Sequence, residues 1–302
     1  MNNQIISVEL KKLHLPSPSS HKGQNGRLLI IGGSHLFHAA SLWALQVASR
    51  IVDLVHYSSV SQNNQIVQKL KEEFRNGIVV PRSEIESYIE EDGCVLIGPG
   101  MVRTTESGIK NYELRIKNIK DINKISNEGL QTYYLTKYLL QKYPHKKWVI
   151  DAGALQMLDP NDIPENAILT PHCGEFEGLE LRITNYELGI RNKTLGERAQ
   201  LFAQKYNCVV LLKGAVDIVA SKDKSKEIKG GNAGMTKGGT GDVLAGLVAG
   251  LYCKNDTWIS AVAASYINKK AGEDLYKKMG YWYNASDLAD QIPKTMKKIF
   301  SK

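Results

Sequence analysis

The chain has 302 residues, of which 42% are hydrophobic and 23% charged, as in an ordinary globular protein with a large core. Its longest apolar run, residues 243–252, is too short to span a bilayer, and residues 1–22 lack the apolar segment of a signal peptide, so we expect a cytoplasmic protein without membrane contact. The net charge of +8 comes from residues 110–147 and 291–302, and no nucleic-acid-binding motif is visible, so we expect no nucleic-acid partner.

Short apolar runs alternate with helical segments along most of the chain. The runs predict strands at residues 27–31, 94–97, 148–150, 167–169 and 208–212. The apolar spacing between them predicts helices at residues 39–52, 130–142 and 195–206. Continuous apolar strands are typical of sheets covered on both faces, so the pattern predicts a mainly parallel sheet in a layered α/β fold. Residues 217–220 and 227–229 flank a polar turn and predict an antiparallel hairpin at the sheet edge.

Residues 102–127 depart from this alternation. Ile116, Ile119, Ile122 and Ile125 recur at every third position among lysines and asparagines. The segment is either an extra amphipathic helix or a surface insertion, and we favour the insertion. Because neither a linker nor a repeat is visible, we expect residues 1–302 to form a single domain.

Five unusual residues follow directly after predicted strands: Gly33, Gly100, Asp151, His172 and Lys213. In open parallel sheets, ligands bind beyond the carboxyl ends of the strands. Any one of these residues could serve only the geometry of a turn. The five together predict a binding site at this edge of the sheet.

A glycine-rich segment ends in Gly238-Gly239-Thr240-Gly241-Asp242 and precedes a run of small apolar residues that predicts a buried helix starting near Asp242. Glycines allow the backbone N–H groups to approach a ligand, and the helix dipole favours an anion such as phosphate at that point. A carboxylate there could accept a proton beside the phosphate. The segment therefore indicates phosphoryl transfer to a hydroxyl group, although an aspartate in a first helical turn is often only a capping residue.

On these motifs, the chain resembles the ADP- or ATP-dependent NAD(P)H-hydrate dehydratases of the ribokinase-like superfamily. The resemblance runs in order over nearly the whole chain. The matching stretches are His21-Lys22-Gly23, 27–34, Gly98-Pro99-Gly100-Met101, 151–155, Thr170-Pro171-His172-Cys173-Gly174-Glu175-Phe176, Lys213-Gly214, 234–246, Ala285-Ser286-Asp287-Leu288 and Ile292-Pro293. The expected fold is accordingly a ribokinase-like layered α/β fold.

The resemblance implies repair of hydrated NADH or NADPH, in the S epimer, with ADP or ATP as phosphate donor and Mg²⁺ as cofactor. Asp242 would be the catalytic base. The residues expected around the hydrate are Ala40, Gly100, His172 and Asp242. Those expected around the nucleotide are Lys213, Gly214, Ala215, Val216, Asp217, Gly239, Thr240 and Gly241. The resemblance further implies that Glu175 helps to hold Mg²⁺ through water, and that the protein is a homo-oligomer such as a tetramer.

Each assignment has a structural alternative. His172 could only complete a turn, Lys213 could only end a strand, and Glu175 could cap a helix. The family often has an acid where this chain has Gly153 and a proline where it has Cys173, which leaves details of the substrate side open. At the level of function, the alternatives are a kinase of a small vitamin precursor or sugar in the same superfamily, and a nucleotide-binding sensor without turnover.

Overall fold

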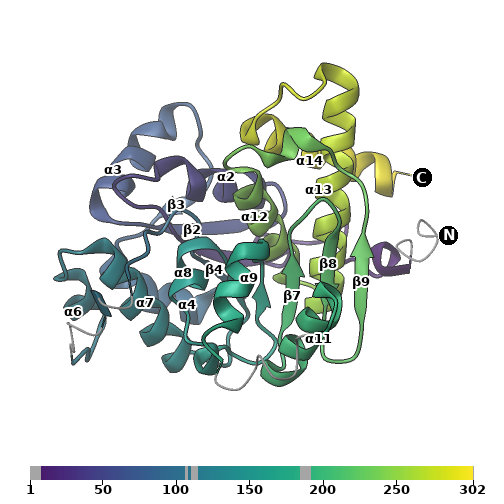
Figure 1. The fold of residues 1–302 in the computed structure, drawn as a ribbon. Coiled ribbons are helices and arrows are strands. Elements are labelled where there is room, and N and C mark those ends of the chain that lie inside the picture. Colours follow the sequence, from purple (N-terminus) through teal and green to yellow (C-terminus); the bar gives the residue numbers. More distant parts are fainter. Residues whose placement is uncertain (1–7, 106–107, 110–114, 184–191, 302) are drawn as a thin grey trace.

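The computed structural model describes residues 8–105, 108–109, 115–183 and 192–301, and it is built around one nine-stranded sheet with helices on both faces (Figure 1). The strand order is β3-β2-β1-β4-β5-β6-β7-β8-β9. Strands β1 to β7 are parallel, and β8 and β9 form an antiparallel hairpin at one edge. The strands are β1 (Arg27–Ile31), β2 (Leu54–Ser58), β3 (Ile78–Val79), β4 (Cys94–Ile97), β5 (Trp148–Ile150), β6 (Ile168–Leu169), β7 (Val209–Leu212), β8 (Asp217–Ala220) and β9 (Ser225–Ile228). The predicted α/β fold, its mainly parallel sheet and its edge hairpin are confirmed.

The helices fill the connections between the strands and the C-terminal part of the chain. None of those in the described ranges is both long and apolar enough to cross a membrane. They are α2 (His38–Ala48), α3 (Ser61–Lys69), α4 (Ile85–Glu91), α6 (Ile119–Asn123), α7 (Glu128–Lys142), α8 (Ala152–Met157), α9 (Cys173–Glu180), α11 (Leu195–Tyr206), α12 (Thr240–Tyr252), α13 (Thr257–Met279) and α14 (Ala285–Phe300), with the short 3₁₀ helices η1 (Leu70–Glu72), η2 (Arg82–Glu84), η3 (Pro160–Asp162) and η4 (Ala233–Thr236).

Two strands, β2 and β3, were not predicted from the sequence. His56 interrupts the apolar run of β2, and its ring nitrogen Nδ1 lies 2.8 Å from Oδ2 of Asp92 in the buried interior. Strand β3 has only two residues, so it carries no periodicity. These strands lie beyond β1, so the strand order reverses between β1 and β4. In doubly wound sheets, such a switch point opens a crevice in which ligands bind.

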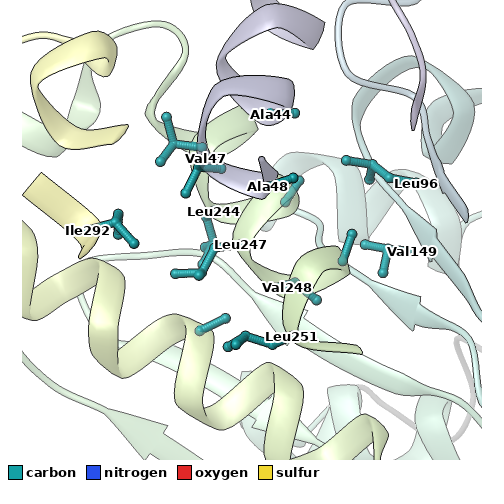
Figure 2. Close-up of a cluster of buried hydrophobic side chains, with 14 of the residues drawn as sticks. Ala44, Val47, Ala48, Leu96, Val149, Leu244, Leu247, Val248, Leu251 and Ile292 are labelled. Carbon is teal, nitrogen blue, oxygen red and sulfur yellow. The ribbon is translucent and has the colours of Figure 1, made fainter. Parts of the chain in front are cut away.

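Helix α12 lies at the centre of the larger core cluster, between the sheet and helix α2. Its sequence is apolar on all sides, which is typical of a helix that is fully buried. Figure 2 shows Leu244, Leu247 and Val248 of α12 among side chains of α2, the sheet and α14. A Cβ on Gly246 would lie 2.5 Å from the carbonyl oxygen of Ala44, so glycine permits the close approach of the two helices. This packing fixes the N-terminus of α12 above the carboxyl edge of the sheet.

The described part of residues 102–127 packs into the second core cluster, on the opposite face of the sheet. Ile119 and Ile122 of α6 are fully buried there, and Ile116 and Ile125 pack against the same cluster. The three-residue spacing places these side chains on one side of the segment. Residues 115–127 thus have a buried apolar face and exposed positions such as Lys117 and Lys124, whereas residues 106–107 and 110–114 of the segment lie outside the described residues.

Candidate active site

The carboxyl ends of the parallel strands bring the predicted site residues to one edge of the sheet. Gly33 follows β1 and Gly100 follows β4, and the N–H of Gly33 donates to the carbonyl oxygen of Pro99 at 2.7 Å. A Cβ on Gly100 would lie 2.9 Å from the Cβ of Ala40 and 3.2 Å from the Cα of Gly33. Ala40 and Gly100, which were expected to contact the hydrate, are thus in contact with each other at the switch point between β1 and β4.

A buried ion pair joins the ends of β5 and β7. The Nζ atom of Lys213 lies 2.9 Å from Oδ1 of Asp151, and the hydroxyl of Thr170 donates to the same oxygen at 2.7 Å. Burial disfavours the charged form of Lys213, but the carboxylates of Asp151, Glu175 and Asp242 outweigh it and raise the pKa of this lysine. Lys213 therefore keeps its positive charge at this edge of the sheet at neutral pH. Asp151 was one of the five residues that predicted a site at this edge, but it was given no role there.

Asp242 lies in the first turn of α12, beside this ion pair. Burial, followed by the negative charge of Asp151, raises the pKa of Asp242 to about 7, while Lys213 opposes the shift. A general base works best when its pKa is close to the operating pH. The environment of Asp242 therefore suits proton abstraction.

The turn before α12 forms the predicted anion loop. Gly239 takes a left-handed conformation with φ of 93°, and a Cβ there would lie 2.3 Å from the ring of Trp43. The hydroxyl of Thr240 closes the turn by donating to the carbonyl oxygens of Met235 and Lys237. The first helical hydrogen bond runs from the N–H of Val243 to the oxygen of Gly239, so the N–H groups of residues 241 and 242 have no acceptor within the helix. An anion is favoured at such a helix N-terminus.

A cavity of about 650 Å³ opens beside the anion loop. Among the residues expected around the nucleotide, the following line it: Lys213, Gly214, Ala215, Asp217, Thr240 and Gly241. Val216 is exposed outside the lining. The cavity thus collects most of the predicted nucleotide residues, and His172 also borders it.

The carboxylate of Asp217 is fully engaged with protein groups. Oδ1 accepts from the N–H of Gly214 at 2.9 Å and lies 3.1 Å from Nζ of Lys269, and Oδ2 accepts from the hydroxyl of Ser265 at 2.7 Å. Lys269 also donates to the carbonyl oxygens of Gly214 and Ala215, at 3.0 and 3.1 Å. Asp217 and Lys269 therefore hold the turn at residues 213–216 in place by hydrogen bonds to its backbone.

Asn268 and Lys269 on α13 both line the cavity, and neither was predicted from the sequence. Both side chains are buried, and the Oδ1 atom of Asn268 has no hydrogen-bond partner within the described residues. A signal was present, because two polar residues directly follow the mostly apolar run at 259–267. Only the placement of α13 against the cavity shows that these two residues belong to its lining.

His172 and Glu175 form a capping box at the start of α9. The N–H of Glu175 donates to Nδ1 of His172 at 3.2 Å, and the N–H of His172 donates to Oε2 of Glu175 at 2.9 Å. Gln156 donates to the remaining oxygen of Glu175 at 2.8 Å. The capping alternative therefore describes both residues, while the imidazole of His172 remains largely exposed at the cavity.

The donor set suits a magnesium ion held through water. Within the described ranges, no cluster of three His, Cys, Asp or Glu side chains is arranged to bind a metal directly. Asp151, Glu175 and Asp242 nevertheless all act electrostatically on Lys213, so the described residues place three carboxylates near one lysine. Mg²⁺ prefers oxygen ligands and keeps several waters, so it fits this arrangement together with the phosphates of a nucleotide.

Comparison with known proteins places the chain in a family. A family model described as NAD(P)H-hydrate dehydratase matches residues 28–294. The chain is 32% identical to the ADP-dependent (S)-NAD(P)H-hydrate dehydratase of Nitrosopumilus maritimus, over 98% of both chains. It is 35% identical to a bifunctional NAD(P)H-hydrate repair enzyme of Methanocaldococcus jannaschii, over 96% of this chain, and it spans about half the length of that protein (52%).

The fold matches that of the ADP/ATP-dependent NAD(P)H-hydrate dehydratase of Bacillus subtilis, a structure co-crystallised with ATP and Mg²⁺, with a TM-score of 0.72 and 22% identity over 97% of each chain. The predicted ribokinase-like fold is confirmed by such matches. The order of the motifs along the sequence, the family model and the relatives all agree. The chain belongs to the NAD(P)H-hydrate dehydratase family.

Proposed function

We propose that this protein converts the S epimer of NADH hydrate or NADPH hydrate back to the reduced cofactor, with ADP or ATP as phosphate donor. The observation that carries the proposal is the position of Asp242, whose pKa is raised to about 7 in the first turn of α12, next to the anion loop and Lys213. A base and a phosphate-binding turn at one point are what phosphorylation of a hydroxyl group requires. The names of the relatives supply the substrate.

The proposed reaction has two stages. Asp242 takes the proton from the ring hydroxyl while the hydroxyl oxygen attacks the terminal phosphorus of the nucleotide, and the bond to the leaving nucleotide breaks. The N–H groups at residues 241 and 242 and the ammonium of Lys213 stabilise the charge on the transferring group. The ring nitrogen then supplies an electron pair, the C–O bond breaks, a ring proton is lost, and phosphate leaves. Phosphate departs far more readily than hydroxide, which explains why a nucleotide is consumed in a dehydration.

Other residues position the reactants. Ala40 and Gly100 would receive the hydrated ring at the switch point, with His172 at the border between hydrate and nucleotide. The turn at residues 213–217 and the loop at 239–241 would hold the nucleotide. Mg²⁺, when bound, would neutralise phosphate charge, and Glu175 and Asp242 would hold it through water. We also propose that residues 1–302 act as one domain in a cytoplasmic homo-oligomer such as a tetramer. The four free cysteines suit a reducing compartment.

The test is direct. Purified protein is mixed with NADH hydrate or NADPH hydrate, Mg²⁺, and either ADP or ATP, and the absorbance band of the dihydronicotinamide is followed. A rise that requires the nucleotide is expected, and it also identifies the donor. If no absorbance returns although the folded protein binds nucleotide, the dehydratase proposal is wrong, and a phosphorylated small molecule becomes the product to search for.

A further inference from the structure

A second cavity, of about 790 Å³, opens at the same edge of the sheet, beyond β2 and β3. Its walls come from the start of α3, the 3₁₀ helix η2 and the connection from α6 to α7. None of the residues given a role in the proposed reaction lines this cavity. Its lining includes Ser59, Asn64, Arg82, Lys124, Glu128 and Gln131.

Arg82 is the unusual member of this lining, because its guanidinium is buried with unused donors. The residue is only 8% exposed, and Nη1 donates to Oε1 of Gln131 at 3.1 Å. Nε and Nη2 are buried and have no hydrogen-bond partner in the described part of the chain. Burial lowers the pKa of Arg82 to about 10, so the side chain is still a cation at neutral pH. A buried cation with two unpaired donors is costly unless a ligand meets them.

The nearby carboxylate of Glu128 does not satisfy these donors. Its charge raises the pKa of Arg82, but its oxygens bind His35, accepting from the N–H at 3.3 Å and lying 2.7 Å from the ring Nδ1. This contact ties the loop between β1 and α2 to the first turn of α7. An oxyanion would complete Arg82, because a guanidinium offers it paired donors.

The cavity lies beside the switch point, because Ser59 contacts Gly33 and also lines the cavity. Strand β2 pairs with β1, and a Cβ on Gly33 would lie 2.1 Å from Nδ2 of Asn63 and 2.7 Å from Oγ of Ser59. Ser59 also lines the second cavity. Neighbouring strands are about 4.8 Å apart, so the step from β4, which precedes Gly100, to β2 is about 10 Å. A dinucleotide whose hydrated ring lies at the switch point extends over at least this span, so its non-reacting part would reach the cavity.

We propose that the Arg82 cavity binds phosphate oxygens of the hydrated dinucleotide, and so anchors the end of the substrate that does not react. This inference rests on the proposed function and extends it. The phosphate is either the pyrophosphate that NADH hydrate and NADPH hydrate share, or the 2′-phosphate that only NADPH hydrate carries. The two sources offer the same chemistry to Arg82 and differ in which substrates depend on it.

The test compares Arg82→Gln and Arg82→Lys with Arg75→Gln, a matched control at an exposed arginine outside the cavity. Arg82→Gln is expected to raise KM for the hydrate about ten- to a hundredfold, the range for a lost charged hydrogen bond, with a smaller change in kcat. Arg82→Lys should recover part of the affinity, and Arg75→Gln should match the wild type. An equal rise for both hydrates assigns the pyrophosphate, whereas a rise for NADPH hydrate alone assigns the 2′-phosphate.

Calorimetric titrations with NADH and NADPH separate this proposal from the dehydratase activity, because they require no turnover. Weaker binding to Arg82→Gln, but not to Arg75→Gln, supports the subsite even where no hydrate is converted. Thermal melts of each variant show whether it is folded. Unchanged KM and Kd in a folded Arg82→Gln protein would overturn the proposal, as would a wild type that binds neither dinucleotide.

Discussion

The ammonium of Lys213 lies 2.9 Å from Oδ1 of Asp151, and it also stands 3.5 Å from the position that a Cβ on Gly241 would occupy. One buried cation thus connects the end of β5 with the first turn of α12. Because it is shared among three carboxylates, it lowers the pKa of Asp242 only in part, and Asp242 remains close to its titration midpoint at neutral pH. The charges of Lys213 and these carboxylates therefore affect both the activity and the stability of the protein.

Asp242→Asn is expected to reduce kcat about 10²- to 10⁴-fold, the usual contribution of a positioned general base. Nucleotide affinity should stay the same or increase, because the change removes a negative charge beside the phosphates. Steady-state kinetics and a separate nucleotide titration measure the two effects. Turnover at the wild-type level would exclude Asp242 as the base.

The value of kcat/KM is expected to increase with pH through about pH 7, because Asp242 must lose its proton before it can accept one from the hydrate. Asp151→Asn removes a charge that raises the pKa of Asp242, so it should move this rising limb to lower pH. Glu177→Gln removes an exposed carboxylate on α9 and serves as the control, for which no displacement is expected. If kcat/KM rose at the same pH in Asp151→Asn as in the wild type, a group other than Asp242 would control the rise.

Asp242→Asn should also stabilise the protein at high pH. The pKa of Asp242 is about 7 in the folded state against its ordinary value of 3.8, so the folded state binds more protons between these values. Ionised Asp242 therefore destabilises the folded state as the pH rises. The difference of about three pKa units sets an upper limit of ~4 kcal/mol. Thermal melts at about pH 5 and about pH 8 should therefore show a gain that grows with pH. A gain that is equal at both pH values would contradict this linkage.

Two glycines of the anion loop should respond differently to substitution. The position of a Cβ on Gly241 has only ordinary contacts, with Lys213 at 3.5 Å, so Gly241→Val should fold but weaken nucleotide binding at least about tenfold by blocking the approach to the backbone. Gly239 has φ of 93° and faces Trp43 at 2.3 Å, so Gly239→Ala should lower the melting temperature instead. Normal nucleotide affinity in folded Gly241→Val would remove the phosphate-binding role of the loop.

The sequence was sufficient wherever one segment carries the whole signal. Strands β1, β4, β5 and β7 are continuous apolar runs, and the anion loop combines its glycines with Asp242 within a few residues. Contacts that depend on the strand order could not be predicted from the sequence. Asp151 and Lys213 are 62 residues apart and meet only because β5, β6 and β7 are neighbours. Arg82 was missed for the same reason, because its cavity exists only once β3 and α7 are placed.

Residues 115–127 provide the last prediction, since their isoleucines are buried. Ile122 has no exposed surface, so Ile122→Ala should lower the free energy of unfolding by about 2–5 kcal/mol through lost burial and the cavity that remains. Lys120→Ala, at an exposed position of the same helix α6, should change it by no more than about 0.5 kcal/mol. Deletion of residues 111–126 should then fail to give a stable fold, although residues 111–114 lie outside the described structure. Denaturant unfolding of the two point variants measures the contrast. If Ile122→Ala were as stable as Lys120→Ala, the buried isoleucines would not contribute to the core.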